Sequence, residues 1–77
     1  MMIFEKVKAI IAEELGIEED SIQLESDLSE DLGADSLDAI ELIMEIESQF
    51  DVEIADSEAT KIKLVSDIVK FLESQGK

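Results

Sequence analysis

Residues 31–41 decide how this chain is interpreted: Asp31-Leu32-Gly33-Ala34-Asp35-Ser36-Leu37-Asp38-Ala39-Ile40-Glu41. A single serine stands where a loop ends and apolar residues begin to recur at helical spacing. Aspartates lie directly before it and two positions after it. A serine before an amphipathic helix most often caps that helix, because its oxygen accepts a hydrogen bond from an unpaired N–H group of the first turn. The local pattern alone therefore favours Ser36 as a helix cap.

Apolar periodicity along the rest of the chain predicts an all-α fold, a small bundle of three main helices and one short helix with a long loop between the first and second helices. We expect the main helices at residues 2–15, 36–50 and 64–74. Asp56 is expected to cap a short helix over residues 57–61. The length favours one domain over residues 1–77.

Two local signals mark the start of the first loop. Gly16 fits the stop of the first helix, and Ile17 can fold back onto its last turn. No period is sustained between residues 17 and 35, so the loop needs anchors on the core. We expect its apolar residues to supply them: Ile22, Leu24, Leu28 and Leu32. Leu28 and Leu32 are also spaced for a short helical turn.

The charge is extreme and unevenly placed. The net charge is −15, and residues 9–60 contain none of the six lysines. Such a field repels phosphate backbones and anionic lipid, so we expect no nucleic-acid binding. No run is long enough to span a bilayer, which argues against membrane insertion. The N-terminal segment lacks a signal-peptide pattern, and we expect a cytoplasmic monomer.

The composition argues against catalysis by the chain itself. It has no histidine and no cysteine, which removes the usual neutral-pH base and the thiolate nucleophile. Ser36 has no histidine or lysine nearby in sequence, so a hydrolytic triad is excluded. Paired carboxylates on an exposed acidic helix are best interpreted as solvated. The protein is therefore predicted to be a substrate of other enzymes and not an enzyme.

The second predicted helix carries apolar residues on two opposite sides. One side forms a sufficient core stripe: Ala39, Leu42, Ile43, Ile46 and Phe50. Leu37 and Met44 fall almost opposite this stripe, Ile40 lies on its flank, and Glu41 lies between Leu37 and Met44. Exposed apolar residues among carboxylates favour a binding face, where apolar anchors supply affinity and acids steer basic partners.

The stretch from Asp31 to Asp38 closely resembles the prosthetic-group site of acyl carrier proteins, in which the serine of Asp-Ser-Leu carries 4′-phosphopantetheine. The resemblance extends over most of the chain. It includes Glu14-Leu15-Gly16 at the end of the first helix, the long loop, and then Glu41-Leu42-Ile43-Met44 and Phe50. The form Ala34-Asp35-Ser36-Leu37 is similar to the free-standing carriers of fatty acid synthesis.

This resemblance implies that Ser36 holds 4′-phosphopantetheine covalently, donated by coenzyme A through a separate phosphopantetheinyl transferase. The thiol of the arm would carry acyl chains as thioesters between enzymes of fatty acid biosynthesis. The partners implied are basic surfaces of fatty acid synthesis and acyltransferase enzymes. The family's recognition role carries over to Asp35, Leu37, Asp38, Ile40, Glu41 and Met44. An acyl tail would be sheltered by Ile46, Ile54, Ala59 and Ile62.

Two alternatives stay open at this stage. The chain is also compatible with a dedicated carrier for another acyl group, such as a polyketide, an amino acid or a lipid precursor. An acidic calcium-binding protein is disfavoured, since Gly33 falls one place late for an EF-hand loop and Asp38 stands where glutamate is required. Weak Ca²⁺ or Mg²⁺ binding is still expected at two acidic clusters: Glu30, Asp31, Asp35 and Asp38, and Glu47, Asp51, Glu53 and Asp56.

Overall fold

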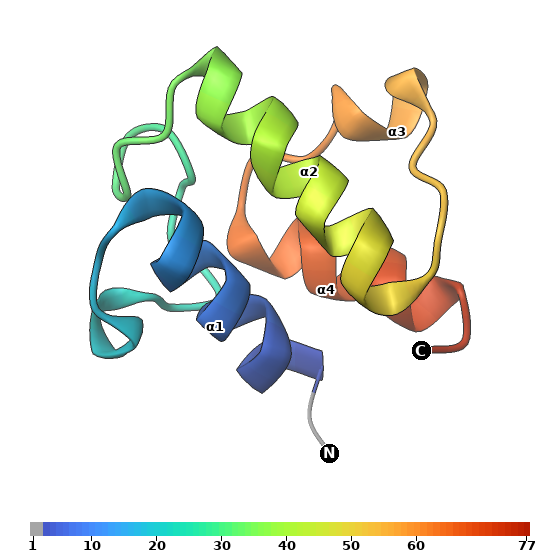
Figure 1. Ribbon diagram of the computed structural model, residues 1–77, viewed down its shortest axis with the longest axis horizontal. Coiled ribbons are helices and arrows are strands. Elements are labelled where there is room, and N and C mark those ends of the chain that lie inside the picture. Colours follow the sequence, from blue (N-terminus) through green and yellow to red (C-terminus); the bar gives the residue numbers. More distant parts are fainter. Residues whose placement is uncertain (1–2) are drawn as a thin grey trace.

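The computed structural model describes residues 3–77, and the regular elements there are all helical. They are α1 (Ile3–Leu15), the 3₁₀ turn η1 (Glu19–Ser21), α2 (Ser36–Phe50), α3 (Asp56–Ala59) and α4 (Val65–Ser74). Figure 1 shows α1 and α3 on opposite sides of α2, with the long α1–α2 segment looping around one end of the bundle. The predicted all-α class is confirmed. Met2, the expected start of the first helix, lies outside the described residues.

Three helices build the core. Each of these helices contributes fully buried side chains. They are Val7 and Ile11 of α1, Leu42 and Ile46 of α2, and Val65, Ile68 and Leu72 of α4. Within each helix these residues recur at three- or four-residue spacing, so each presents one apolar stripe to the centre. No helix within residues 3–77 has the length and apolar character needed to cross a membrane.

The end of α1 follows the sequence signals. Gly16 adopts a positive φ of 67°, a conformation that glycine reaches without strain. The Ile17 N–H then donates to the Ala12 carbonyl at 3.1 Å, which closes the last turn. The predicted helix stop is therefore confirmed.

The long loop is held by some of its expected anchors and by backbone pairing. Ile22 and Leu28 are buried and Leu32 is half-buried, but Leu24 is 42% exposed, so its anchoring role was predicted wrongly. The backbone of Leu24 anchors the loop instead, because its carbonyl accepts a hydrogen bond from the Ser66 N–H at 2.8 Å. The turn predicted at Leu28–Leu32 is present, with Asp31 and Leu32 both donating to the Asp27 carbonyl.

A second tie joins this loop to the segment before α4. The Leu28 N–H donates to the Lys63 carbonyl at 3.0 Å, and the Val65 N–H donates to the Ser26 carbonyl at 3.0 Å. Asp27 and Leu64 thereby form an isolated antiparallel bridge. The loop and the α4 approach are thus brought together next to the start of α2.

The short helix α3 differs from the prediction. It begins at Asp56 and ends at Ala59, and Asp56 does not cap it. The Ala55 carbonyl accepts from the N–H groups of Glu58 and Ala59, both at 2.9 Å, which places Asp56 inside the first turn. The helix then tightens, because Lys61 and Ile62 donate to carbonyls three residues earlier.

The start of α4 is capped by a residue inside the helix, at the third helical position. Leu64 occupies the N-cap position and has no side chain able to accept a hydrogen bond. Instead Asp67 Oδ2 accepts from the N–H groups of Leu64 at 2.9 Å and Lys63 at 3.0 Å. These two bonds, Leu64 first, lower the pKa of Asp67 below its ordinary value of 3.8, although partial burial works against them.

Asp67→Ala is expected to destabilise the fold by about 1 kcal/mol at neutral pH, since two N–H groups lose their partner. Because the pKa of Asp67 is lowered on folding, its carboxylate stabilises the fold above the unfolded pKa. That contribution is lost as the pH falls through the folded value. Urea unfolding of both proteins at neutral pH and below pH 3.8 tests this. A difference that stayed constant in acid would contradict it.

Candidate functional site

The start of α2 is fixed by the two aspartates around Ser36. Asp35 is the N-cap residue, and its Oδ1 accepts from the Asp38 N–H at 2.9 Å. Asp38 Oδ2 reaches back to the Asp35 N–H at 3.3 Å, which completes a capping box. The cap is therefore Asp35, and the expectation that Ser36 caps the helix is wrong. Asp35 caps the helix because it lies one residue before Ser36, at the N-cap position, and its carboxylate accepts from the unpaired Asp38 N–H.

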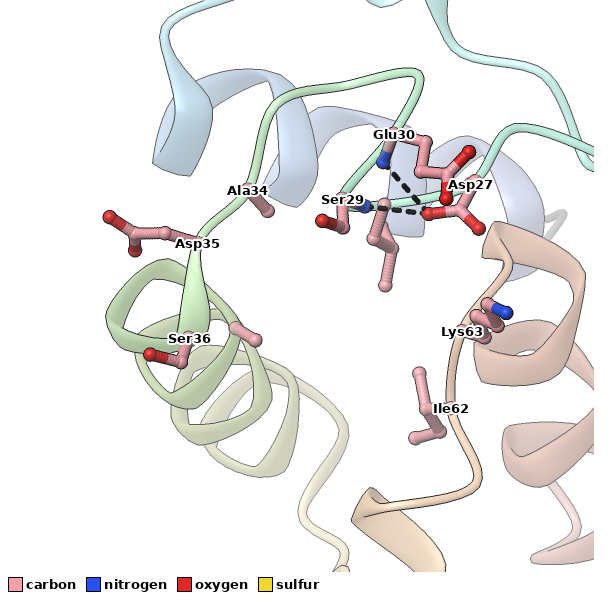
Figure 2. Close-up of a pocket in the computed structure, with 10 residues that line it drawn as sticks. Asp27, Ser29, Glu30, Ala34, Asp35, Ser36, Ile62 and Lys63 are labelled. Atoms are coloured by element: carbon pink, nitrogen blue, oxygen red, sulfur yellow. Dashed lines mark hydrogen bonds between the residues drawn. The ribbon is translucent and has the colours of Figure 1, made fainter.

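Ser36 is left as the first residue of α2 with its side chain in solvent. Figure 2 shows Ser36 and Asp35 at one side of a pocket, with their oxygens pointing away from it, and Ile62 and Lys63 on the other side. The pocket measures about 390 Å³, and its apolar wall consists of Leu28, Ala34, Ala39 and Ile62. A free hydroxyl at the rim of an apolar pocket is accessible to an enzyme and has room beside it for an attached group.

The remaining wall of this pocket was missed by sequence reasoning. Asp27, Ser29 and Glu30 come from the long loop, and Lys63 precedes α4. The loop turns here because Ser29 and Glu30 both donate backbone N–H groups to Asp27 Oδ1 at 2.9 Å. An aspartate followed by such a turn is a recognisable local signal. Nothing in the periodicity indicated that the turn would face Ser36.

The predicted acyl-pocket residues are only partly gathered. Ile62 lines the pocket beside Ser36. Ile46 is fully buried and Ile54 is 8% exposed, so both belong to the closed core, and the half-buried Ala59 packs against it. These three do not border the pocket, and their part in sheltering an acyl tail stays a prediction.

The predicted recognition residues form an exposed face of α2. Leu37, Ile40 and Met44 are 63%, 56% and 61% exposed, while Leu42 and Ile46 on the other side are buried. The two-sided pattern deduced from helical spacing is thus present. Glu41 lies on the same exposed side. Asp35 and Asp38, by contrast, use part of their carboxylates in the cap.

The two expected cation-binding clusters do not form preformed sites. Within residues 3–77 no three acidic side chains converge on a position that suits a metal ion. In the first cluster, Asp31 Oδ2 already accepts from the Asp27 N–H at 2.7 Å. In the second, Glu47 Oε2 accepts from the Ile54 N–H at 2.8 Å. Weak divalent binding at these clusters therefore stays a prediction.

Self-repulsion is expected to limit stability. The chain carries a net charge of −15, and the single ion pair within residues 3–77 joins Lys8 to Glu5 at 3.9 Å. NaCl should raise the melting temperature by screening, and Ca²⁺ or Mg²⁺ should do so at lower ionic strength by binding the native carboxylates. A melting series in the three chlorides, matched for ionic strength, measures both effects. Melting independent of salt would contradict the repulsion, and one submicromolar Ca²⁺ site would contradict weak binding.

Comparison with known proteins addresses the same region. A family model described as the phosphopantetheine attachment site matches residues 5–72. An acyl carrier protein of Campylobacter lari is 48% identical over 77 residues and covers 100% of both chains. An acyl carrier protein of Clostridium acetobutylicum is 52% identical over 73 residues, 95% of each chain.

The chain belongs to the acyl carrier protein family. Its fold agrees, because the solved structure of a candidate acyl carrier protein from Mycobacterium tuberculosis superposes with a TM-score of 0.88. That protein is 33% identical and covers 94% of this chain and 96% of its own. Acyl carrier proteins are carriers and not catalysts, and the family model supports attachment of phosphopantetheine. Both points agree with the expectation of a modified substrate protein.

Proposed function

We propose that Ser36 carries 4′-phosphopantetheine and that the chain transports acyl chains between enzymes of fatty acid biosynthesis. The observation that supports this most is the state of Ser36. Its side chain is exposed at the first residue of α2, while Asp35 performs the capping that a serine there would otherwise perform. The hydroxyl is thus free to react, on a backbone held rigid by the Asp35–Asp38 capping box.

In the attachment step, Ser36 Oγ would attack the phosphorus of coenzyme A that bears the pantetheine arm. The bond from that phosphorus to the bridging oxygen breaks, and the nucleotide leaves with the electron pair. The hydroxyl proton passes to a base on the phosphopantetheinyl transferase, because this chain has no histidine. Once attached, the arm supplies a thiol, which the chain itself lacks, for thioester formation.

The surroundings of Ser36 suit both proposed uses. The exposed side of α2 offers Leu37, Ile40 and Met44 to the basic enzymes of fatty acid synthesis and to acyltransferases, with Glu41 among them. An acyl tail that entered the pocket would contact Ile62 together with Leu28, Ala34 and Ala39. It would reach Ile46 and Ile54 only if the core opened, since both are buried.

The proposal is tested by mass spectrometry of the intact chain. Incubation with coenzyme A, Mg²⁺ and a broad-specificity phosphopantetheinyl transferase should add one phosphopantetheine. Protein purified from its source should then carry a series of linear saturated acyl thioesters. Failure of the addition would contradict the carrier role. Aminoacyl or branched polyketide thioesters would leave the attachment intact and contradict the pathway.

A further inference from the structure

The pocket beside Ser36 has one basic side chain on its wall, that of Lys63, and the other charged residues lining it are acidic. The backbone of Lys63 is held on both sides. Its carbonyl accepts from the Leu28 N–H at 3.0 Å, and its N–H donates to Asp67 Oδ2 at 3.0 Å. The side chain takes part in neither bond and is exposed. Lys63 therefore combines a fixed backbone with a flexible four-carbon stem that ends in an amine.

No other lysine lines this pocket. Lys6 and Lys8 of α1 lie with their Nζ atoms over aromatic rings, at 5.3 and 5.0 Å from the ring centres. Lys61 and Lys70 line a different pocket, next to α4. The single ion pair within residues 3–77 does not include Lys63. The amine of Lys63 is thus the lysine nitrogen best placed to reach a group that occupies the pocket beside Ser36.

An acyl tail that folded back into this pocket would rest on its apolar wall. Figure 2 shows Ser36 and Lys63 on opposite sides of the pocket, whose volume is about 390 Å³. The arm starts from Ser36 at the rim, and its amide groups stay in water because their burial without partners is unfavourable. The thioester that joins the arm to the tail then lies at the mouth of the pocket. A thioester tethered there faces the Lys63 amine at an effective concentration of about millimolar or higher.

Lys63 is also the strongest nucleophile on the pocket wall. The carboxylates of Asp27, Glu30 and Asp35 would form anhydrides with an acyl group, and water hydrolyses these. The hydroxyl of Ser29 has no histidine anywhere in the chain to remove its proton. An amine in its neutral form needs no such base, and its acyl product is a stable amide. Acyl groups that leave the arm without an enzyme should therefore collect on Lys63.

We propose that Lys63 is an intramolecular acyl acceptor, whose amine takes the acyl group from the thioester of the arm. This rests on the carrier function proposed above. The Nζ lone pair attacks the thioester carbonyl carbon, the carbon–sulfur bond breaks, and the sulfur leaves with its electron pair. The proton lost from nitrogen converts the thiolate to the thiol, so no further reactant is needed. The acyl group ends as an amide that keeps the pocket filled, and the arm is again able to accept another acyl group.

The test uses the full chain loaded with an octanoyl arm by a broad-specificity phosphopantetheinyl transferase and octanoyl-coenzyme A. The loaded chain is incubated at about pH 9, where a larger share of a lysine amine is neutral than at pH 7. Hydroxylamine then removes acyl groups from thioesters and leaves amides intact. The intact mass after hydroxylamine should show a growing share of chains that keep the octanoyl group. Acylation of Lys63 blocks trypsin there, so residues 62–70 should appear as one octanoylated peptide.

Two matched variants locate the acceptor. Lys63→Arg keeps the positive charge and removes the nucleophile, so the hydroxylamine-resistant share of loaded chains should fall at least about tenfold. Lys61→Arg, an exposed lysine two residues away that lines the other pocket, should behave like wild type. The Ser36→Ala chain, mixed with loaded wild type, should stay without an octanoyl group because it has no arm of its own.

Each other outcome has a definite meaning. Complete removal of the octanoyl group by hydroxylamine from loaded wild type would overturn the proposal and leave the carrier function standing. A resistant share that persisted in Lys63→Arg, or that spread evenly over the six lysines, would overturn the assignment of Lys63. Equal acylation of the Ser36→Ala chain would show transfer between molecules and overturn the intramolecular step. Wild type that accepted no octanoyl arm would overturn the carrier function itself.

Discussion

Replacing Ser36 with alanine should abolish phosphopantetheine addition completely. The modification needs an oxygen nucleophile at this position, and alanine has none. Stability should hardly change, because Asp35 and not Ser36 caps α2. The substitution places the better helix former at the first helical position, which favours a small gain, if any, of at most about 0.5 kcal/mol. Intact mass after incubation with coenzyme A, Mg²⁺ and the transferase measures the first effect, and urea unfolding measures the second.

Ser29→Ala is the matched control. Ser29 lines the same pocket from the opposite loop and is also exposed. It uses its backbone N–H, not its hydroxyl, to bond Asp27. The Ser29→Ala chain should therefore accept one phosphopantetheine at the wild-type rate. Modification of the Ser36→Ala chain, or loss of modification in Ser29→Ala alone, would disprove the assignment of Ser36.

The helices that pack a single apolar stripe against the core were predictable from the sequence. The expected span of the second helix, Ser36–Phe50, agrees with α2 at both ends. The last helix was expected one residue early, at Leu64 instead of Val65. Burial of a continuous apolar stripe dominates the energy of such helices, and the stripe is visible in the order of residues. The same logic placed Leu37 and Met44 on the exposed side and Ile40 on the flank of the stripe, where it is also exposed.

The caps and the loop were not predictable in the same way. Asp35, Ser36 and Asp38 are all good capping residues, and small differences in geometry decide among them. Asp67 caps α4 from within the helix. The N-cap position itself holds Leu64, which gives no capping signal in the sequence. The wall of the Ser36 pocket depends on the Leu28–Lys63 hydrogen bond, a long-range contact without local periodicity.

Ile46→Ala should destabilise the fold by about 2–5 kcal/mol, whereas Met44→Ala should change it by no more than about 0.5 kcal/mol. Ile46 is fully buried. Met44 lies two residues away on the same helix, and the residue is 61% exposed. Truncation of Ile46 removes apolar burial and leaves a cavity. Truncation of Met44 removes only surface contacts. Urea unfolding at fixed salt measures both changes.

Ile46→Val keeps this prediction measurable if Ile46→Ala fails to fold, because a chain of 77 residues has a total stability of only about 4–12 kcal/mol. Ile46→Val should destabilise the fold by about 0.5–1.5 kcal/mol.

The relative size of the two effects reverses for docking. Met44→Ala should lower kcat/KM for the transferase several-fold, since exposed apolar anchors supply affinity. Ile46→Val, which leaves the surface unchanged, should be modified at the wild-type rate. Equal destabilisation by Met44→Ala and Ile46→Ala would refute the two faces of α2, and a normal rate for Met44→Ala would remove Met44 from the recognition surface.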